Sequence, residues 1–575
     1  MNFFSEIYGT ISFMAKSSEG IKHSRITLAL VIITSITTGL SSTALVALIT
    51  RGLNGNSANM QSLMWPFIAL CLVLPASRSV SAVLLNRFVT TAGMELRMEL
   101  CRRILASPLR LVEELGAHRI LASLTDDIPA ITATLASLPG FCMQLTIVLG
   151  CMAYLLWLSP KLFLIVLGFV IVGAVSYRLP LAKAIKLFRL FRQEWDALFK
   201  SLQALIGGIK ELKLHHRRSE ALLWESIEPH SIAHRNYNVR ANTIATLASS
   251  WGQILFFVLI GLLLFGLRRG AIVNLEVLTG YTLTVLFMMG PLEAVLNTLG
   301  GWTRAAVAIE RVKELGMLLP IPSFKSSIVS KPLFWEKLEL QNLTHTYHRE
   351  DENTGYTLGP IDMTIRRGEM IFVTGGNGSG KTTFAKLISG LYAPQDGEIL
   401  LDGQRITDQT RGQYSQNFSI IFYDFFLFET LLGLQEAELD TKANEYLEKL
   451  KLNHKVKVKD GAFDTLELSQ GQRKRLALLT AYLEDRPIYI FDEWAADQDP
   501  YFKQVFYFNL LPELKSKGKT VLVITHDDRY FHLADRIIKL TNGKIEYDQL
   551  EHGPQVGLFA DKAFDLLQAG PPHTA

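Results

Sequence analysis

The sequence predicts a polytopic α-helical membrane domain of six spans, fused to an α/β P-loop nucleotide-binding domain. The chain has 575 residues, which is too long for one hydrophobic core and indicates two or more domains. Residues 1–315 contain several long stretches without charge, whereas residues 335–550 have the composition of a soluble α/β domain. In that second part a glycine-rich segment follows a short apolar run, as it does in phosphate-binding loops.

Composition excludes several classes of protein. Charged residues make up 19% of the chain, below the usual level of about 25%, and the mean hydropathy is +0.21. A net charge of +4 is too small to indicate binding to nucleic acid, so we expect no nucleic-acid partner. The cysteines lie in or next to apolar runs and form no CxxC pair, so we expect neither a disulfide framework nor a zinc site.

Six apolar segments are long enough to cross a lipid bilayer, for which a helix needs about 20 mainly apolar residues. The first contains no Asp, Glu, Lys or Arg and is too long to be the apolar part of a cleaved signal peptide. The third turns directly into the fourth at Ser159-Pro160. The predicted spans are Ile26–Thr50, Gln61–Leu84, a segment within Ile128–Pro160, Leu162–Tyr177, a segment within Ala241–Leu267, and a segment from near Val277 past Pro291.

Basic residues between the spans predict the orientation of the chain. The N-terminal segment and the loops 85–127 and 178–240 together contain 21 Lys and Arg, and only four lie on the other side. Because Lys and Arg favour the cytoplasmic side of a membrane, we expect both long loops and both termini in the cytoplasm.

Both long loops show helical periodicity, which favours helices that continue below the bilayer over floppy connectors. Within them, Ala122–Ile128 and Gly207–Lys213 are each either a short contact helix pressing on a soluble domain or a solvated helical face. Two charged residues, Arg78 and Glu293, lie close to membrane spans. Each either extends its side chain to the interface or lines a cavity.

A segment with two prolines, Leu318–Ile328, marks the boundary between the two halves. We therefore predict a six-helix transmembrane domain with cytoplasmic helical extensions over residues 1–317 and a linker over 318–335. A nucleotide-binding domain is expected over residues 336–555, followed by a C-terminal tail over 556–575.

The phosphate loop is the strongest chemical signal in the chain. The apolar run Met370–Thr374, which we interpret as a buried strand, leads into the spacing G-x-x-x-x-G-K-T and then a helical pattern. Glycines let backbone N–H groups converge on phosphates at a helix N-terminus, where the helix dipole also favours anions. Lys381 would reach the β- and γ-phosphates of ATP, and the Thr382 hydroxyl would bind Mg²⁺. The expected nucleotide-binding residues of this loop are Gly375, Gly376, Asn377, Gly378, Ser379, Gly380, Lys381, Thr382 and Thr383.

Two further apolar runs, which we interpret as buried strands, end in polar residues. One ends in Asp492 and Glu493, and the other ends in His526. Asp492 suits the outer shell of a Mg²⁺ ion that keeps its waters. Glu493 is placed to polarise the attacking water, while His526 would bind the γ-phosphate and position both the water and Glu493. Glu493, His526 and Lys381 are the expected catalytic residues.

A second anion site is predicted where Leu468–Arg475 opens a helix. Ser469 occupies a capping position, and with Gly471 and Gln472 it places a hydroxyl and backbone N–H groups at a helix N-terminus. One nucleotide does not easily need two such sites from a single chain. The second site is best explained as closing on ATP that is held by another copy of the chain.

The order of these motifs resembles the nucleotide-binding domain of ATP-binding-cassette (ABC) transporters. The six-span half resembles a type IV ABC exporter membrane domain, so the resemblance covers nearly the whole chain. Closer still, Gly375–Lys381, Asp492–Pro500 and Gly208–Leu214 are similar to the branch that exports cyclic peptides, microcins and siderophore peptides. The resemblance implies a half-size exporter that works as a homodimer in the bacterial cytoplasmic (inner) membrane.

The resemblance also implies roles for individual residues. Tyr347 matches the aromatic residue that stacks on adenine, and Asp499 matches the aspartate of the loop that crosses the dimer interface. The family's usual glutamine, a Mg²⁺ ligand, is replaced by Tyr423. This departure puts the metal-ligand role of that position in question, and Asp424 is the candidate substitute.

From these observations we expect ATP-driven export of a peptide by alternating access. The cargo would be a cyclic or lariat peptide, of the siderophore or antimicrobial kind. Export of a lipid, an amino acid or another small metabolite is the alternative. A soluble ABC ATPase would have paired cassettes and no spans, and a peptide-processing exporter would carry an N-terminal cysteine protease, whereas the first cysteine here is Cys71, within a span.

Overall fold

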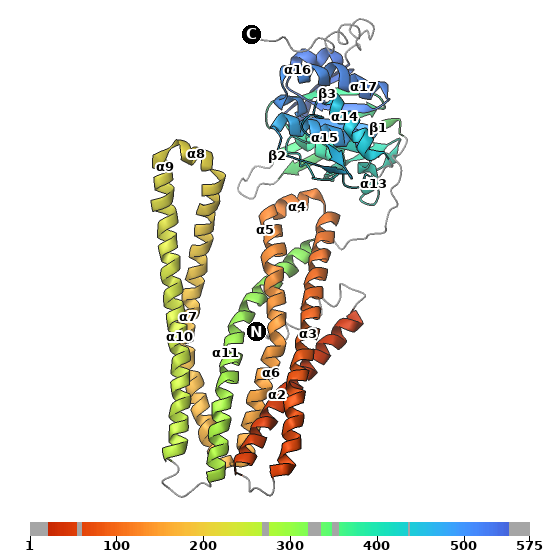
Figure 1. The fold of residues 1–575 in the computed structure, drawn as a ribbon. Coiled ribbons are helices and arrows are strands. Elements are labelled where there is room, and N and C mark those ends of the chain that lie inside the picture. The colour runs from red at the N-terminus through yellow and green to blue at the C-terminus, as the bar shows by residue number, and fades with distance from the viewer. Residues whose placement is uncertain are drawn as a thin grey trace. The chain divides into compact units, whose positions relative to one another are not determined.

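A computed structural model of the chain describes residues 21–54, 60–266, 275–319, 335–347, 356–434 and 438–550. The chain divides into two units (Figure 1). The helical unit comprises Met1–Ala106 and Leu115–Pro322, and the α/β unit comprises Ser107–Glu114 and Ser323–Ala575. The predicted linker and C-terminal tail lie largely outside the described residues, so the domain boundaries stay predictions.

The helical unit consists of long helices joined by short turns. Several contain proline, which membrane helices tolerate because neighbouring groups satisfy the freed backbone carbonyls. Its helices are α2 (Ile21–Asn54), α3 (Met60–Ala106), α5 (Ala117–Ala122), α6 (Ile128–Leu158), α7 (Pro160–Gly207), α8 (Ile209–Leu214), α9 (His216–Ala221), α10 (Glu228–Gly261) and α11 (Leu275–Leu318), with π-helical turns η2 (Ser123–Asp127), η3 (Leu222–Ile227) and η4 (Leu262–Gly266).

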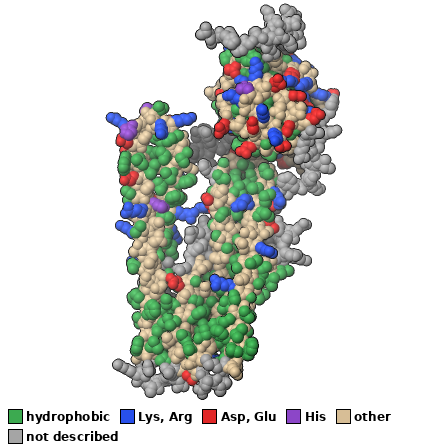
Figure 2. Space-filling view, in the orientation of Figure 1, with side chains coloured by type: hydrophobic (Ala, Val, Ile, Leu, Met, Phe, Trp, Pro, Cys, Tyr) green, Lys and Arg blue, Asp and Glu red, His purple; other side chains and the backbone are tan. Residues whose placement is uncertain are grey.

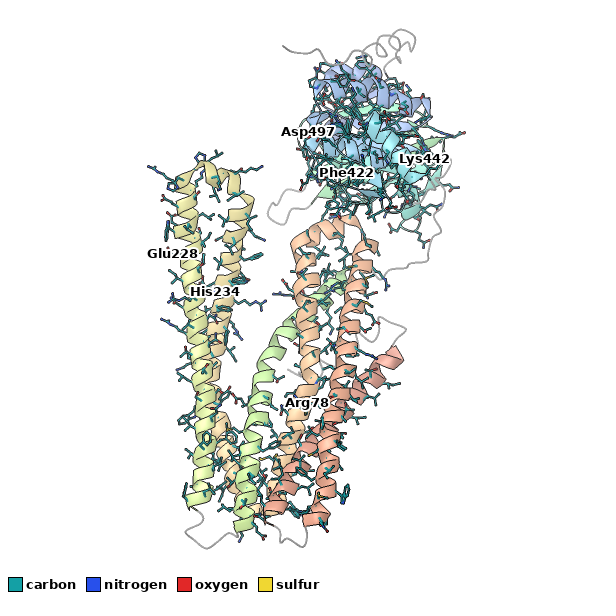
Figure 3. All side chains as sticks on the ribbon, in the orientation of Figure 1. Arg78, Glu228, His234, Phe422, Lys442 and Asp497 are labelled. Atoms are coloured by element: carbon teal, nitrogen blue, oxygen red, sulfur yellow. The ribbon has the colours of Figure 1, made fainter. Side chains whose placement is uncertain are left out.

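Six helices in the described part of the chain are long and apolar enough to cross a membrane, which confirms the predicted number of spans. The predicted turn between the third and fourth spans is also confirmed, because Ser159 separates α6 from α7. On the face drawn in Figure 2, hydrophobic side chains cover most of one end of the helical unit. Arg78 lies on α3 (Figure 3) and is exposed, and both interpretations of this charge stay open.

Small and hydroxyl-bearing side chains bring the membrane helices into close contact. Ser35 and Ser81 share a hydrogen bond of 3.0 Å between α2 and α3. A Cβ atom at Gly150 of α6 would lie 2.7 Å from the Thr43 hydroxyl of α2. In addition, the buried Tyr281 hydroxyl of α11 donates to the Leu155 carbonyl at 2.6 Å. Lipid provides no hydrophobic drive for helix association, so such close packing and interhelical hydrogen bonds hold the unit together.

The segment Ala122–Ile128, interpreted as either a contact helix or a solvated helical face, does not form a separate short helix. These residues form the turn η2 and run without a break into α6. The Ser123 hydroxyl donates to the Asp127 carboxylate at 3.3 Å, and both side chains are buried within the helical unit. A short helix earlier in the chain, α4 (Leu109–Leu115), belongs to the α/β unit as far as Glu114, because that unit includes Ser107–Glu114.

The other predicted break, at Gly207-Gly208, is present. It separates α7 from α8, and no residue of α8 is buried. The aliphatic side chains Ile209 and Leu214 are both exposed.

The α/β unit contains α4 and the following strands and helices: β1 (Lys337–Tyr347), β2 (Tyr356–Arg366), β3 (Met370–Thr374), α12 (Lys381–Ile388), β4 (Asp396–Leu401), β5 (Gln404–Arg405), α13 (Arg411–Ser415), β6 (Phe418–Ile421), α14 (Leu439–Lys449), β7 (Val458–Lys459), β8 (Ala462–Phe463), α15 (Gln470–Glu484), β9 (Ile488–Asp492), α16 (Pro500–Gln504), α17 (Leu511–Ser516), β10 (Thr520–Ile524), β11 (Arg536–Thr541) and β12 (Lys544–Leu550), with 3₁₀ turns η6 (Trp494–Asp497) and η8 (Asp528–Leu533) and a π-helical turn η7 (Val505–Leu510).

A six-stranded sheet in the order β12-β11-β3-β10-β9-β6 forms the centre of the unit. All its pairings are parallel except that between β11 and β12. Every residue of β9 and β10 is buried, as continuous apolar runs in a parallel sheet predict. A second, antiparallel sheet has the order β2-β1-β4-β5. The three apolar runs that we interpreted as buried strands are therefore β3, β9 and β10, and they are adjacent.

Candidate nucleotide-binding site

The candidate site lies at the carboxyl ends of four neighbouring parallel strands. Strand β3 leads into the phosphate loop, β10 into His526, β9 into Glu493, and β6 into the segment that contains Tyr423. In open α/β sheets, ligands bind in the crevice outside these strand ends. Sheet order therefore brings together segments that lie more than a hundred residues apart in the chain.

The phosphate loop has a backbone that only glycine accommodates at two positions. Gly375 has φ 150°, and a Cβ atom there would lie 2.2 Å from the Leu540 carbonyl oxygen. Gly380 has φ 97° and caps the N-terminus of α12. Its missing Cβ would lie 2.7 Å from the Tyr356 hydroxyl. The loop therefore packs tightly against Leu540 and Tyr356 and leads directly into α12.

Lys381 is the first residue of α12, and its side chain is only 7% exposed. Its ammonium group donates to the carbonyls of Gly375 and Gly376, each at 3.0 Å. It also lies 3.9 Å from the Glu493 carboxylate. These contacts hold the lysine within the curve of the loop, where the sequence analysis placed it.

The remaining predicted catalytic and metal-binding side chains converge on the same point. The Thr382 hydroxyl donates to the Asp492 carboxylate at 2.8 Å. The imidazole Nε2 of His526 lies 3.2 Å from Oε1 of Glu493. Glu493 itself has a left-handed backbone with φ 49°, an uncommon conformation for a residue with a side chain and one often found at functional sites.

Burial controls the electrostatics of the site. It lowers the pKa of Lys381, against the opposite effects of Glu493 and Asp492. Burial likewise raises the pKa of Asp492, with the Thr382 hydrogen bond acting in the opposite direction and Glu493 adding to the increase. Bound phosphates would favour the charged lysine, and a bound cation would favour the ionised aspartate.

The second predicted anion site is formed by its own helix cap. Ser469 caps α15 in a capping box, in which the backbone N–H of Gln472 donates to the Ser469 hydroxyl at 3.4 Å and the backbone N–H of Ser469 donates to Gln472 Oε1 at 3.2 Å. Ser469 is exposed. Among the hydrogen bonds of the described residues, none joins Ser469 to the phosphate loop. The free face of this cap is therefore available to a group from outside the chain.

The segment that contains Asp499 is tied to the start of α15. Gln498 donates to the Gly471 carbonyl at 2.9 Å and accepts from Arg475, also at 2.9 Å. Arg475 also forms an ion pair with Asp499, which caps α16 by accepting from the Phe502 N–H at 2.9 Å. The two segments expected at a dimer interface thus form one rigid surface.

Sequence reasoning missed Lys474, whose side chain is fully buried beside the site. Its ammonium donates to the Glu493 carbonyl at 2.9 Å and pairs with Asp497 at 2.7 Å. It also lies 5.1 Å from the centre of the Tyr423 ring, within cation–π distance. Within the sequence this lysine belongs to the basic run Arg473-Lys-Arg475, which is typical of an exposed surface. Its position four residues before the apolar Leu478, on the buried face of α15, was the available signal.

The roles of Tyr423 and Tyr347 stay predictions. Tyr423 is 55% exposed, and its ring contacts the Lys474 ammonium, so its part in binding the metal stays a prediction. Tyr347 ends β1 opposite Tyr356, but its side chain lies outside the described residues, so its adenine-stacking role stays a prediction.

The residues present fit a nucleotide with its magnesium ion. The Ser379 hydroxyl is buried inside the phosphate loop, and among the described residues it has no hydrogen-bond partner. A buried polar atom without a partner is costly, and a phosphate oxygen would satisfy it. Thr382 and Asp492 offer the hydroxyl and carboxylate oxygens that Mg²⁺ prefers. Their individual roles remain predictions.

The fold and the site together define a P-loop nucleotide-binding domain joined to six membrane-capable helices. Residues 358–496 match the ABC transporter family, and residues 28–292 match the ABC transporter transmembrane region. The chain belongs to the ABC transporter family and is an exporter-type half-transporter, with a membrane domain and an ATPase domain in one polypeptide.

Three relatives illustrate the range of similarity. The chain is 40% identical to the ATP-binding protein SyrD of Pseudomonas syringae pv. syringae, over 90% of this chain and 93% of that protein. It is 25% identical to an ATP-dependent lipid A-core flippase of Aliivibrio fischeri, over 87% of each chain. The subtilin transport ATP-binding protein SpaT of Bacillus subtilis is 30% identical over 41% of this chain and 40% of that protein.

Proposed function

We propose that this chain exports a peptide by ATP-driven alternating access, as a homodimer in the bacterial inner membrane with both termini in the cytoplasm. The cargo is a cyclic or lariat peptide of the siderophore or antimicrobial kind. The similarity to SyrD over nearly the full length of both chains supports this proposal, as do the motifs similar to the peptide-exporting branch. The orientation follows from the distribution of Lys and Arg.

The single observation that carries the ATPase part is the convergence of Lys381, Thr382 and the polar residues after β9 and β10. Phosphoryl-transfer enzymes need positioned charges more than covalent chemistry, and this cluster supplies both signs of charge. Such an arrangement at the carboxyl ends of neighbouring strands suits ATP hydrolysis better than simple nucleotide binding.

Within the proposal, each side chain has a separate role. Lys381 and the backbone of the phosphate loop bind the β- and γ-phosphates. Thr382 and Asp492 hold Mg²⁺, which neutralises charge on the phosphate oxygens when bound. Glu493 accepts a proton from the attacking water, and His526 holds the Glu493 carboxylate in place. The exposed cap at Ser469 closes on the nucleotide of the partner subunit.

A second candidate function is export of a lipid or another small metabolite. The match to lipid A-core flippases over most of both chains favours it, although at 25% identity. The two candidates differ only in the cargo, because both use the same ATPase cycle.

Reconstituted vesicles distinguish the two candidates. The protein is inserted in proteoliposomes, and ATP is supplied to outward-facing α/β units. Uptake is then measured for a panel of labelled cyclic peptides, lipids and amino acids. We expect ATP-dependent accumulation of peptides only. Uptake of lipid without uptake of any peptide would establish the alternative.

Glu493→Gln is the catalytic control in these vesicles. A positioned general base contributes about 10²–10⁴-fold to a rate, so hydrolysis should fall at least about a hundredfold while ATP binding is retained. Wild-type turnover in this variant would remove Glu493 from the catalytic role.

A further inference from the structure

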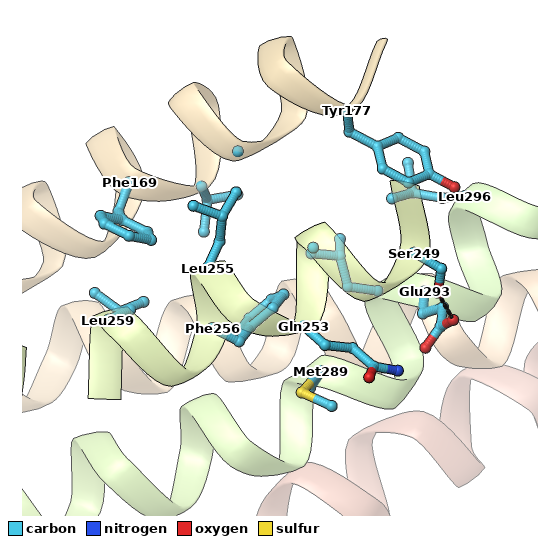
Figure 4. A pocket seen from close by; sticks show the side chains of 14 residues that line it. Phe169, Tyr177, Ser249, Gln253, Leu255, Phe256, Leu259, Met289, Glu293 and Leu296 are labelled. Carbon is cyan, nitrogen blue, oxygen red and sulfur yellow. Dashed lines mark hydrogen bonds between the residues drawn. The ribbon is translucent and has the colours of Figure 1, made fainter. Parts of the chain in front are cut away.

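A cavity of about 120 Å³ lies inside the helical unit between α7, α10 and α11. Most of its lining is apolar, but polar side chains gather at one end (Figure 4). Phe169 and Phe256 lie at the apolar end, and Tyr177, Ser249, Gln253 and Glu293 contribute polar groups. A few polar groups placed in an apolar cavity are typical of a small-molecule binding site.

Glu293 gives the cavity its charge. Its side chain is half-buried, and its carboxylate accepts a hydrogen bond from the Ser249 hydroxyl at 2.5 Å. The Ser249 contact directs the carboxylate across to α10, so the cavity-lining interpretation of Glu293 fits better than the interface interpretation. Among the described residues, no Lys or Arg forms an ion pair with Glu293.

A carboxylate in a membrane span is costly unless it has a partner. One neutral hydroxyl satisfies only part of its hydrogen-bonding capacity, which is about four acceptor positions. An ammonium or guanidinium group would satisfy the rest with charge-assisted hydrogen bonds. The chemistry of the cavity therefore selects a cation with an apolar body, since apolar side chains form most of the wall.

The size of the cavity limits what enters it. A comparable cavity of about 150 Å³ holds one benzene molecule, so this one accommodates a single side chain rather than a whole peptide. Gly252 lies in the wall, and a Cβ atom there would have no neighbour within 4 Å. The wall is thus open where the helix α10 faces the cavity, and it can be filled by a larger residue without a clash.

We propose that this cavity is the part of the cargo site that binds a cationic side chain of the exported peptide, with Glu293 as the residue that selects the charge. This inference rests on the proposed function, since it names the chemistry of the cargo. The Ser249 hydroxyl holds the carboxylate in place, and the apolar end takes the methylene chain of the bound side chain.

Matched probes test the inference on the full-length protein in nanodiscs. One probe is a labelled cyclic peptide that carries a single ornithine, and its partner has norvaline at that position. A second pair, dodecylamine and dodecanol, offers the same difference of charge without a peptide. Dissociation constants are measured for the wild type and for Glu293→Gln.

We expect Glu293→Gln to weaken binding of the ornithine peptide by about tenfold or more, as for loss of a hydrogen bond to a charged group. The dissociation constant of the norvaline peptide should stay within about twofold of the wild-type value. Glu293→Asp should restore most of the affinity. Equal weakening of both peptides, or no change in either, would overturn the proposal.

A steric variant tests the cavity without changing its charge. Gly252→Leu should fill the cavity and weaken the binding of both peptides. The control is Gly261→Leu on the same helix, because Gly261 also has open space around its Cβ position but does not line the cavity. Equal effects of the two variants would remove the cavity from the binding site. The elution volume of the dimer in size-exclusion chromatography and the melting temperature identify any variant that misfolds. If a variant misfolds, the affinities of Glu293→Asp for the two peptides are compared with those of the wild type instead.

The alkyl pair separates this inference from the proposed function. In one outcome, Glu293→Gln weakens binding of dodecylamine but not of dodecanol, and no peptide is bound or transported. The cation site then stands and peptide export fails. If peptides are transported while no probe responds to Glu293, peptide export stands and the cation site fails.

Discussion

The fully buried Lys474 connects helix α15 to two segments beside the site. It binds the backbone of Glu493, pairs with Asp497 and contacts the ring of Tyr423. A buried charge is retained only when partners compensate its desolvation, and here the partners lie on the segment 493–497 and on the segment that contains Tyr423. We infer that Lys474 positions Glu493 without touching the nucleotide.

Replacing Lys474 separates this positioning role from binding. Lys474→Met should lower kcat by about 10–100-fold, because a shift of about 1 Å in a catalytic group costs rate on that scale. The Kd for ATP should change by no more than about twofold. Lys474→Gln keeps a donor toward the Glu493 carbonyl and should recover most of the rate. The exposed Lys455→Met is the matched control and should behave as wild type. A loss of ATP affinity that accounts for the whole effect would contradict the positioning role.

Tyr423 affords a second test at the same scale. Its ring, rather than its hydroxyl, makes the described contact with Lys474. Tyr423→Phe should therefore leave the affinity for Mg²⁺-ATP within about twofold, whereas Tyr423→Ala should alter the stimulation of ATPase by cargo. Affinity is measured by nucleotide titration with and without Mg²⁺, and stimulation is measured as the ATPase rate with and without cargo. A large loss of Mg²⁺-dependent binding in Tyr423→Phe would place the hydroxyl in the metal's shell instead.

Among the elements, α4 is joined by chain connectivity to the long helices of the helical unit but packs with the α/β unit. Glu113 accepts a hydrogen bond from Lys386 of α12 at 2.8 Å and another from Tyr392. Lys386 lies five residues after the phosphate-loop lysine on the same helix. A displacement of α12 on nucleotide binding can therefore reach α4 through the ion pair between Lys386 and Glu113.

We expect Glu113→Gln and Lys386→Met each to reduce the ratio of cargo-stimulated to basal ATPase, and to do so by similar amounts. The double variant should be no worse than either single one, because both remove the same contact. Glu114→Gln is the matched control, since Glu114 pairs with its neighbour Arg110 in the described structure. Additive effects of the two substitutions would show that the pair does not transmit the signal.

The difference between predicted and missed elements has a physical cause. The phosphate loop was predictable because its glycines and Lys381 have a fixed local spacing, and β9 and β10 were predictable because buried parallel strands are continuous apolar runs. Helix α4 has only seven residues, too few for a helical period to stand out. Its partners on α12 and beyond lie more than 270 residues away, and such long-range contacts leave no mark in local pattern. Lys474 was missed for a different reason, because it lies in a run of three basic residues that is typical of an exposed surface.

For the whole molecule, the central question is which chain supplies Ser469 to a given nucleotide. The hydroxyl of Ser469 bonds only within its own capping box among the described residues, and it is exposed. Gln498 and Arg475 fix the neighbouring Asp499 segment to the same surface. A rigid, exposed anion site that does not use its own phosphate loop is the arrangement that a partner subunit would complete.

A mixed dimer decides the question. One chain carries Lys381→Ala, the other carries Ser469→Arg, and two different tags isolate only the mixed species. If the sites are shared, one site contains both substitutions and the other pairs an intact Lys381 with an intact Ser469. Vanadate trapping of labelled nucleotide should then survive at roughly half the wild-type amount, as one intact phosphoryl-transfer site allows.

The reciprocal dimer supplies the contrary outcome. With both substitutions on one chain and a wild-type partner, shared sites predict that each site contains one defect, so trapping is lost. If each chain used its own pair, the result would reverse: the first dimer would trap nothing, and the second would retain one working site. Trapping is preferable to steady-state turnover, because a single intact site need not sustain a full transport cycle. The two dimers contain the same substitutions in the same amounts, so only the sharing of sites between chains can make them differ in this direction.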